Sequence, residues 1–265
     1  MFSSLRLGRV FGVDLYIHGT FWLLPALIIF SGFLSGDTAG LGLDLAVIFA
    51  LFGCVALHEL GHALAARFFG VRTKHITLYP IGGVAQLERI PDKPGPEIVI
   101  ALAGPAVNVA IAAALAMLLL VLAPWLQADH LLAGATGVFL SRLLIVNIVL
   151  VLFNLIPAFP MDGGRVFRAF LQLFTDRLNA TTIAVTVGSI IAFLFGLYGI
   201  VTANLTLIFI GVVVFLLGQA ELTGVRMQEE QKRRAADRPP RLPVDLFWPQ
   251  RGGGGTYPTI TQLSR

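Results

Sequence analysis

The residues with the clearest chemical potential are the five of the run HELGH, from His58 to His62, which lie in an otherwise apolar stretch. Residues four apart share a helix face, so His58 and His62 can both present a ring nitrogen to one metal ion. Glu59 lies about 100° around the helix, where it can hold a water molecule rather than the metal. A bound metal lowers the pKa of that water and polarises a carbonyl group. The motif predicts metal-assisted hydrolysis with Glu59 as general base; a pair of ordinary core histidines is the alternative.

A third ligand is needed, because catalytic zinc sites take three protein ligands and keep a fourth position open. The outstanding candidate is Asp162, within the run NLIPAFPMDGG at residues 154–164. Its two prolines are expected to break a helix, and the two glycines permit a sharp turn. The run alone is equally compatible with Asp162 capping the helix that follows.

The composition places these residues in a membrane protein. Hydrophobic residues make up 56% of the 265 residues and charged residues 13%, whereas soluble domains carry about 25% charged residues. This balance excludes a soluble enzyme, a disordered protein and a nucleic-acid binder, despite a sequence pI near 9.6. The single cysteine, Cys54, excludes an internal disulfide framework and a cysteine-based metal cluster.

Stretches of about 20 mostly apolar residues predict six transmembrane helices, near residues 17–36, 44–67, 98–124, 138–157, 180–200 and 204–222. With these spans, 18 of the 19 Lys and Arg residues fall on one side of the membrane, which predicts a multi-pass protein with both termini in the cytoplasm. His58 and Asp162 then both lie in the cytoplasmic half of the bilayer, which favours the metal role for Asp162. The first span could instead be a signal peptide cut near Ala39.

Two segments lie outside the spans. Apolar and polar residues roughly alternate in the segment 71–88, around a Pro-Ile-Gly-Gly turn. This pattern predicts a small β-hairpin at the cytoplasmic face. The hairpin either pairs with an extended substrate or serves as a simple lid. Residues 225–265 are charged, then Pro-rich, then Gly-rich, and predict a disordered cytoplasmic tail after a membrane core at residues 1–224. The expected fold class is an all-α polytopic membrane protein with six transmembrane helices and this hairpin.

The HELGH motif at 58–62 and the NLIPAFPMDGGR stretch at 154–165 resemble, in order and spacing, two hallmark motifs of the site-2 protease family of intramembrane zinc metalloproteases. YPIGGVAQLE at 79–88 and AGPAVNVA at 103–110 support the resemblance, and residues 8–24 are similar to the opening of prokaryotic members. The similarity covers roughly residues 8–220. We expect the prokaryotic type without C-terminal CBS domains and without a periplasmic PDZ-like insertion.

The resemblance implies one Zn²⁺ per chain, with His58, His62 and Asp162 as its ligands and Glu59 as the base. It also suggests Asn154 as a hydrogen-bond donor in the site, which either stabilises the oxyanion of the reaction or simply bonds to the backbone of a neighbouring helix. The implied partners are the lipid bilayer and single-span membrane-protein substrates such as anti-sigma factors. The implied location is the inner (plasma) membrane of a prokaryotic cell, and nucleic acid is not an expected partner.

Regulated intramembrane proteolysis is therefore the expected function. The alternative is a membrane metal transporter or carrier that uses the same histidine and aspartate site. Glu59 discriminates between the two, because hydrolysis requires a carboxylate beside the metal that is not a ligand, whereas transport does not. An inactive relative is less favoured, since every catalytic residue of the motifs is present.

Overall fold

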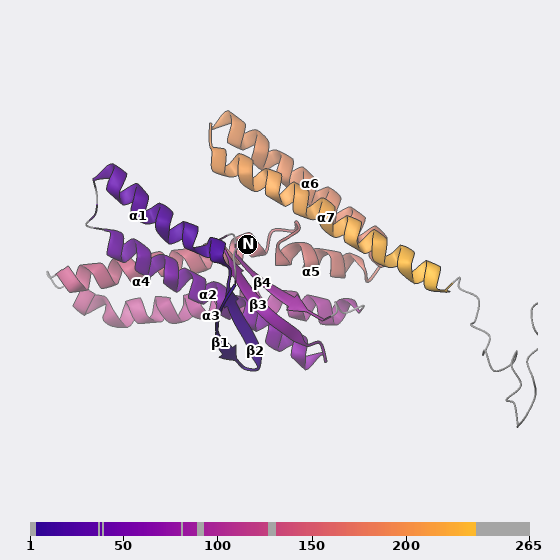
Figure 1. The fold of residues 1–265 in the computed structure, drawn as a ribbon, viewed down its shortest axis with the longest axis horizontal. Coiled ribbons are helices and arrows are strands. Elements are labelled where there is room, and N and C mark those ends of the chain that lie inside the picture. The colour runs from indigo at the N-terminus through magenta and orange to yellow at the C-terminus, as the bar shows by residue number, and fades with distance from the viewer. Residues whose placement is uncertain are drawn as a thin grey trace, which may run out of the picture. The chain divides into compact units, whose positions relative to one another are not determined.

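The computed structural model describes residues 4–36, 38, 40–80, 82–88, 93–126 and 131–236 (Figure 1). The chain divides into two compact units, Met1–Arg226 and Met227–Arg265. The elements in chain order are β1 (Leu5–Val10), β2 (Val13–Ile17), a short 3-10 helix (Gly19–Trp22), α1 (Leu23–Ser35), α2 (Leu41–Phe68), β3 (Thr73–Tyr79), β4 (Gly82–Leu87), α3 (Pro94–Leu126), α4 (Leu131–Asn154), α5 (Asp162–Leu171), α6 (Arg177–Val201) and α7 (Leu205–Ala236).

Among the residues that the structure describes, five helices are long and apolar enough to cross a membrane: α2, α3, α4, α6 and α7. They coincide with the last five predicted spans, so the chain has the helices of a multi-pass membrane protein. The first predicted span, at residues 17–36, is not confirmed as a full span. Residues up to Ile17 form a strand and Gly19–Trp22 form a 3-10 turn, which leaves α1 with 13 residues. That is ~20 Å of helix, shorter than the ~30 Å hydrocarbon core of a bilayer.

The strands form one four-stranded sheet in the order β1-β2-β3-β4. The predicted hairpin is confirmed as β3 and β4, which pair antiparallel with His75 opposite Gln86 and Tyr79 opposite Gly82. β2 pairs antiparallel with β1 and parallel with β3. The expectation of helices with a single hairpin was therefore wrong in one respect, because the N-terminal residues add two further strands.

The turn between β1 and β2 explains how these strands form. Phe11 and Gly12 join the paired residues Val10 and Val13 and have φ angles of 47° and 89°. Positive φ at both central residues is the property of the two-residue type I′ turn, which matches the twist of a hairpin. The flanking residues alternate between apolar and polar types, as in half-buried strands.

One face of the sheet packs on the half of α2 that carries the HELGH motif. The buried cluster between them comprises Val13, Phe21, Phe52, Leu60, Ala63, Ile76 and Leu78. Phe21, from the 3-10 turn, packs edge-on against Phe52 of α2 with ring centroids 4.6 Å apart. This cluster holds β3 and β4 beside the motif.

The chain breaks between α4 and α5 as its two prolines predict, since α4 ends at Asn154 and α5 begins at Asp162. Helix α5 is anchored by Arg168, whose side chain is 1% exposed and forms ion pairs with Glu97 of α3 and, at 2.5 Å, with Glu221 of α7. Burial alone would lower the pKa of Arg168, but the two carboxylates raise it. The first turn of α5 is thereby held in a fixed position relative to α3.

Helices α6 and α7 lie side by side (Figure 1) and are joined by residues 202–204, close to the boundary between the predicted spans 180–200 and 204–222. Asn204 accepts a hydrogen bond from the backbone N–H of Leu207 at 3.2 Å and so caps α7. Helix α7 continues to Ala236, although residues 225–236 were expected to belong to a disordered tail. Ala, Glu, Gln, Lys and Arg in this stretch favour helix, and Lys232 pairs with Glu229 at 3.2 Å. Residues 237–265 of the predicted tail lie outside the described residues.

Candidate metal centre

Helices α2 and α5 bring the three predicted metal ligands together, although Asp162 lies 104 and 100 residues after the two histidines. His58 Nε2 and His62 Nε2 each lie 3.1 Å from Asp162 Oδ2. The two Nε2 atoms are 3.0 Å apart. In the part of the chain that the structure describes, these residues form the one group of three or more His, Cys, Asp or Glu side chains with ligand atoms all within 4.8 Å.

The position of Asp162 bears on the choice between ligand and helix cap. Asp162 is the first residue of α5, and Met161 occupies the N-cap position. The Asp162 carboxylate contacts both histidines through one oxygen, and the residue is only 7% exposed. This geometry supports the ligand alternative over the capping alternative.

The remaining ring nitrogens of the histidines fix where their protons lie. His62 Nδ1 donates to the backbone carbonyl oxygen of Ile100 at 2.7 Å, and His58 Nδ1 donates to Oδ1 of Asn108 at the same distance. A neutral imidazole carries one proton, so both Nε2 atoms present lone pairs. Such hydrogen bonds are the usual support of histidines that bind metal.

These atoms fit one zinc ion. Two lone-pair nitrogens and a carboxylate oxygen that lie 3.0–3.1 Å apart repel one another unless a cation lies among them. Two imidazoles and one carboxylate are also a known donor set of catalytic zinc, which leaves the fourth position for water or substrate. His58 and His62 are buried, at 6% and 5% exposure, so the site lies in surroundings of low polarity.

Glu59 lies beside this centre and faces the same cavity. A cavity of about 380 Å³ is lined by His58, Glu59 and Asp162, together with residues of β3, β4, α4 and α7. Gly83 of β4 packs on Glu59 so closely that a Cβ at position 83 would lie 2.5 Å from the Glu59 Cγ. The backbone of β4 therefore passes directly over the predicted base, next to the space where water and a carbonyl group could meet.

Asn154 lines this cavity too, at the end of α4. Its Nδ2 donates a hydrogen bond to the backbone oxygen of Leu150, one turn earlier in the same helix, at 3.0 Å. The structure thus brings Asn154 to the site, but its backbone hydrogen bond lies within its own helix and not with the neighbouring helix that the structural alternative expects. An amide NH₂ has two donors, so this bond uses one of them.

Sequence reasoning missed two buried amides that support the histidines, Asn108 of α3 and Asn147 of α4, both 0% exposed. Asn108 lies within the AGPAVNVA run, and Asn147 lies within the predicted span at 138–157. The available signal was an amide inside an apolar span, where an unpaired polar group is costly. Cys54 is buried in an apolar cluster with Leu115, Leu140 and Leu143 and is not part of the metal group.

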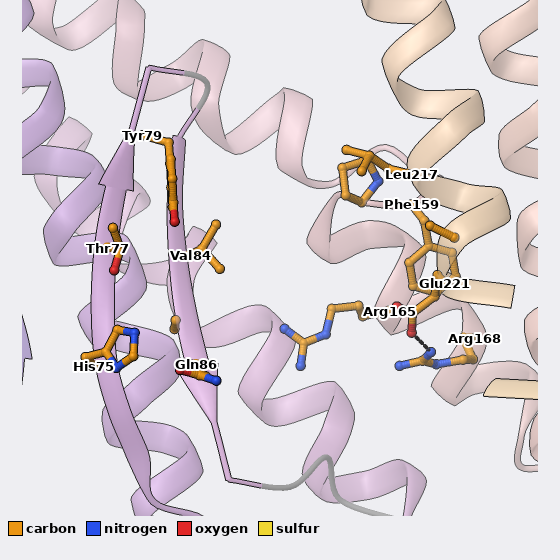
Figure 2. Close-up of a pocket in the computed structure, with 13 residues that line it drawn as sticks. His75, Thr77, Tyr79, Val84, Gln86, Phe159, Arg165, Arg168, Leu217 and Glu221 are labelled. Atoms are coloured by element: carbon orange, nitrogen blue, oxygen red, sulfur yellow. Dashed lines mark hydrogen bonds and ion pairs between the residues drawn. The ribbon is translucent and has the colours of Figure 1, made fainter. Parts of the chain in front are cut away.

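A groove of about 760 Å³ adjoins the cavity, between the β3–β4 hairpin and helices α5 and α7 (Figure 2). Tyr79, Val84, Pro160 and Leu217 line both the groove and the cavity. Figure 2 shows the guanidinium group of Arg165 extending from α5 toward β4. Among the residues that the structure describes, no hydrogen bond or ion pair joins Arg165 to a partner, so this cation is available to a ligand in the groove.

Comparison with known proteins agrees with this geometry. The model of Peptidase family M50 matches residues 46–138 and 126–197, which include all the metal-site residues named above. The chain is 36% identical over 226 residues to a zinc metalloprotease of Methanocaldococcus jannaschii, covering 85% of this chain and 62% of that protein. It is 29% identical over 171 residues to stage IV sporulation protein FB of Bacillus subtilis, covering 63% of this chain and 49% of that protein.

The chain thus spans about 62% and 49% of the lengths of these two curated relatives. A solved structure, the site-2 protease from Methanocaldococcus jannaschii, matches with a TM-score of 0.61 and 35% sequence identity. This match covers 83% of the present chain and 95% of the solved one. The family model, the shared sequence and the shared fold lead to one conclusion: the chain belongs to Peptidase family M50, the site-2 protease family.

Proposed function

We propose that the chain is an intramembrane zinc metalloprotease, which hydrolyses a peptide bond within or near the transmembrane segment of membrane-protein substrates. The observation that carries this proposal is the set of three ligand atoms from His58, His62 and Asp162, with Glu59 in the same cavity. Relatives named as zinc metalloproteases favour hydrolysis over the metal-transport alternative. So does Glu59, a carboxylate next to the centre that is not among its ligands.

In this proposal His58, His62 and Asp162 hold one zinc ion, which when bound activates water and polarises the scissile carbonyl group. Glu59 accepts the proton of the attacking water and passes it to the leaving amine. The second N–H of the Asn154 amide donates to the oxyanion that forms on the substrate.

The groove supports a route for the substrate. Peptide bonds in a helix are shielded by their own hydrogen bonds, so a membrane-spanning substrate must become extended before it is cleaved. In the order β1-β2-β3-β4, strand β4 lies at the edge of the sheet, and an edge strand can pair with an extended peptide. A segment that runs along β4 through the groove reaches Glu59, because groove and cavity share four lining residues. The proposed substrates are single-span membrane proteins, such as anti-sigma factors.

The distribution of basic residues supports a specific orientation. With α1 counted as part of a first span, 18 of the 19 Lys and Arg residues lie on one side, which favours cytoplasmic termini in the inner (plasma) membrane of a prokaryotic cell. Residues 225–265 would then form a cytoplasmic extension of a protease core at residues 1–224. The eight Lys and Arg residues of this extension favour contact with the anionic inner leaflet.

The test is a reconstituted cleavage assay. The protein, purified in detergent, should contain one zinc ion per chain and should cleave at least one member of a panel of single-span membrane proteins. Removal of the metal with a chelator should abolish cleavage, and added zinc should restore it. Zinc-loaded protein that transports metal in vesicles but cleaves no member of the panel would contradict the proposal.

A further inference from the structure

A chain of hydrogen bonds between buried amides leads from the metal centre to the backbone of α4. His58 Nδ1 lies 2.7 Å from Asn108 Oδ1, and Asn108 Nδ2 donates to Asn147 Oδ1 at 3.0 Å. Asn147 Nδ2 in turn donates to the carbonyl oxygen of Leu143 at 2.9 Å and contacts the sulfur of Cys54 at 3.4 Å. Both asparagines are 0% exposed, so water does not compete for these groups.

The carbonyl oxygen of Leu143 determines the direction of every hydrogen bond in this series. A carbonyl oxygen can only accept, so the atom of Asn147 that faces it must be the NH₂ group. The oxygen of Asn147 therefore faces Asn108, and because this oxygen can only accept, Asn108 must turn its own NH₂ group toward it. The oxygen of Asn108 is then left to face His58.

This direction decides which nitrogen of His58 carries the proton. Facing the Asn108 oxygen, His58 Nδ1 must donate, so the neutral ring has its lone pair on Nε2, the atom beside Asp162. If the Asn108 amide were reversed, its NH₂ group would face Nδ1. Nδ1 would then have to accept, the proton would move to Nε2, and Nε2 could not bind a metal ion. The metal centre thus requires the orientation of the Asn108 amide in which its oxygen faces His58 Nδ1.

We propose that Asn147 is a positioning residue of the metal centre, which uses the backbone of α4 to orient the Asn108 amide and so holds His58 in the form that binds metal. Asn147 touches neither the ligand atoms nor the cavity that contains Glu59. The role of Asn147 rests on the proposed function, in which His58 is a zinc ligand.

The test compares two substitutions of Asn147 in the full-length protein, purified in detergent, stripped of metal and titrated with zinc against a chromophoric chelator. Asn147→Leu has a similar volume but cannot orient Asn108, and it should weaken zinc binding by about 10–100-fold, the usual effect of losing an outer hydrogen-bond partner. Asn147→Asp should stay close to the wild type. Apolar surroundings favour the neutral carboxyl, whose O–H donates to Leu143 while its carbonyl oxygen accepts from Asn108.

A matched control is Gln219→Leu, which removes another hydrogen bond between spans, from Gln219 of α7 to Ser189 of α6 at 3.3 Å. This variant should bind zinc like the wild type. Thermal unfolding of the metal-free proteins is the second readout, because a purely structural role for Asn147 predicts lower stability with unchanged affinity of the folded fraction. If the leucine variant does not fold, Asn147→Val takes its place.

The outcomes separate cleanly. Weak zinc binding by the leucine or valine variant with near-normal binding by the aspartate variant supports the proposal. Normal affinity in the leucine or valine variant overturns it, and so does an aspartate variant that binds as weakly as the leucine variant. A wild-type protein that binds no zinc would instead overturn the proposed function, and this inference with it.

Discussion

Gly104 of α3 lies directly against the imidazole ring of His62, with no room for a side chain between them. A Cβ atom at position 104 would overlap Nε2 of His62 and would lie 2.7 Å from Nε2 of His58. These two nitrogens are the proposed zinc ligands, so the backbone of α3 forms a wall of the metal centre. Glycine is the residue that permits this approach, because it has no Cβ.

We therefore predict that Gly104→Ala weakens zinc binding. Overpacking of a tight site costs about 1–3 kcal/mol, which corresponds to roughly 5–150-fold in affinity, measured by chelator competition. Gly53→Ala on α2 is the matched control, since no atom lies within 4 Å of its added Cβ, and its affinity should be normal. Equal zinc affinity in the two variants would contradict the proposed ligand positions.

Asn154→Ala distinguishes the catalytic from the structural role of this amide. If its second N–H stabilises the oxyanion, turnover should fall by about 100-fold or more, with zinc content and thermal stability nearly unchanged. If Asn154 serves only its bond to Leu150, the main loss should be in stability. The measurement is turnover per zinc-loaded, folded molecule, and a near-normal value removes Asn154 from the catalytic residues.

The sequence predicted those parts of the site that depend on local spacing. The two histidines are four residues apart on a helix, so their shared face follows from helix geometry, and Glu59 follows from its place beside His58. Asp162 could be identified as a candidate because the metal lacked a third ligand. The choice between ligand and helix cap depends on tertiary structure, which brings one carboxylate oxygen to 3.1 Å from each histidine and so supports the ligand alternative.

The features that the sequence analysis missed depend on contacts between distant segments. Asn108 and Asn147 are 39 residues apart in the sequence, and their hydrogen bond forms only where α3 and α4 meet. The N-terminal strands were missed for a different reason. The long apolar run that begins near Ile17 favours a membrane span, whereas the signal for the two strands is the short local turn at Phe11 and Gly12.

Arg165 provides a test of the substrate groove. Its side chain extends toward β4 (Figure 2) and makes no hydrogen bond or ion pair in the described part of the chain, so an acidic residue of an extended substrate should bind there. A partly exposed ion pair contributes at most about 1 kcal/mol, so Arg165→Gln should raise KM for such substrates up to about fivefold. Substrates with a neutral residue at that position should be unaffected.

The control for Arg165 is Lys74→Gln, which removes the same charge from β3 at a residue that does not line the groove. Cleavage kinetics of both variants are measured on a matched pair of substrates, one acidic and one neutral. An equal rise in KM for both substrates, or for both variants, would show that Arg165 does not bind the acidic residue of the substrate.

Reporter fusions test the membrane topology. Fusions after residues 40, 130 and 202 should report an external location, and those after residues 90, 175 and 230 a cytoplasmic one. The fusion after residue 40 carries the most information, because α1 has only 13 residues and the first predicted span is not confirmed as a full span. A reversed signal at any position would show that the number of spans is wrong.

In the proposed mechanism, His58, His62 and Asp162 hold zinc while Glu59 moves protons without binding the metal. The most direct measurement is zinc content together with cleavage rate in the purified Glu59→Gln variant, with His58→Ala as the comparison. We predict one zinc ion per chain and no detectable cleavage for Glu59→Gln, and loss of both zinc and cleavage for His58→Ala. Cleavage at a substantial rate by Glu59→Gln would contradict the account.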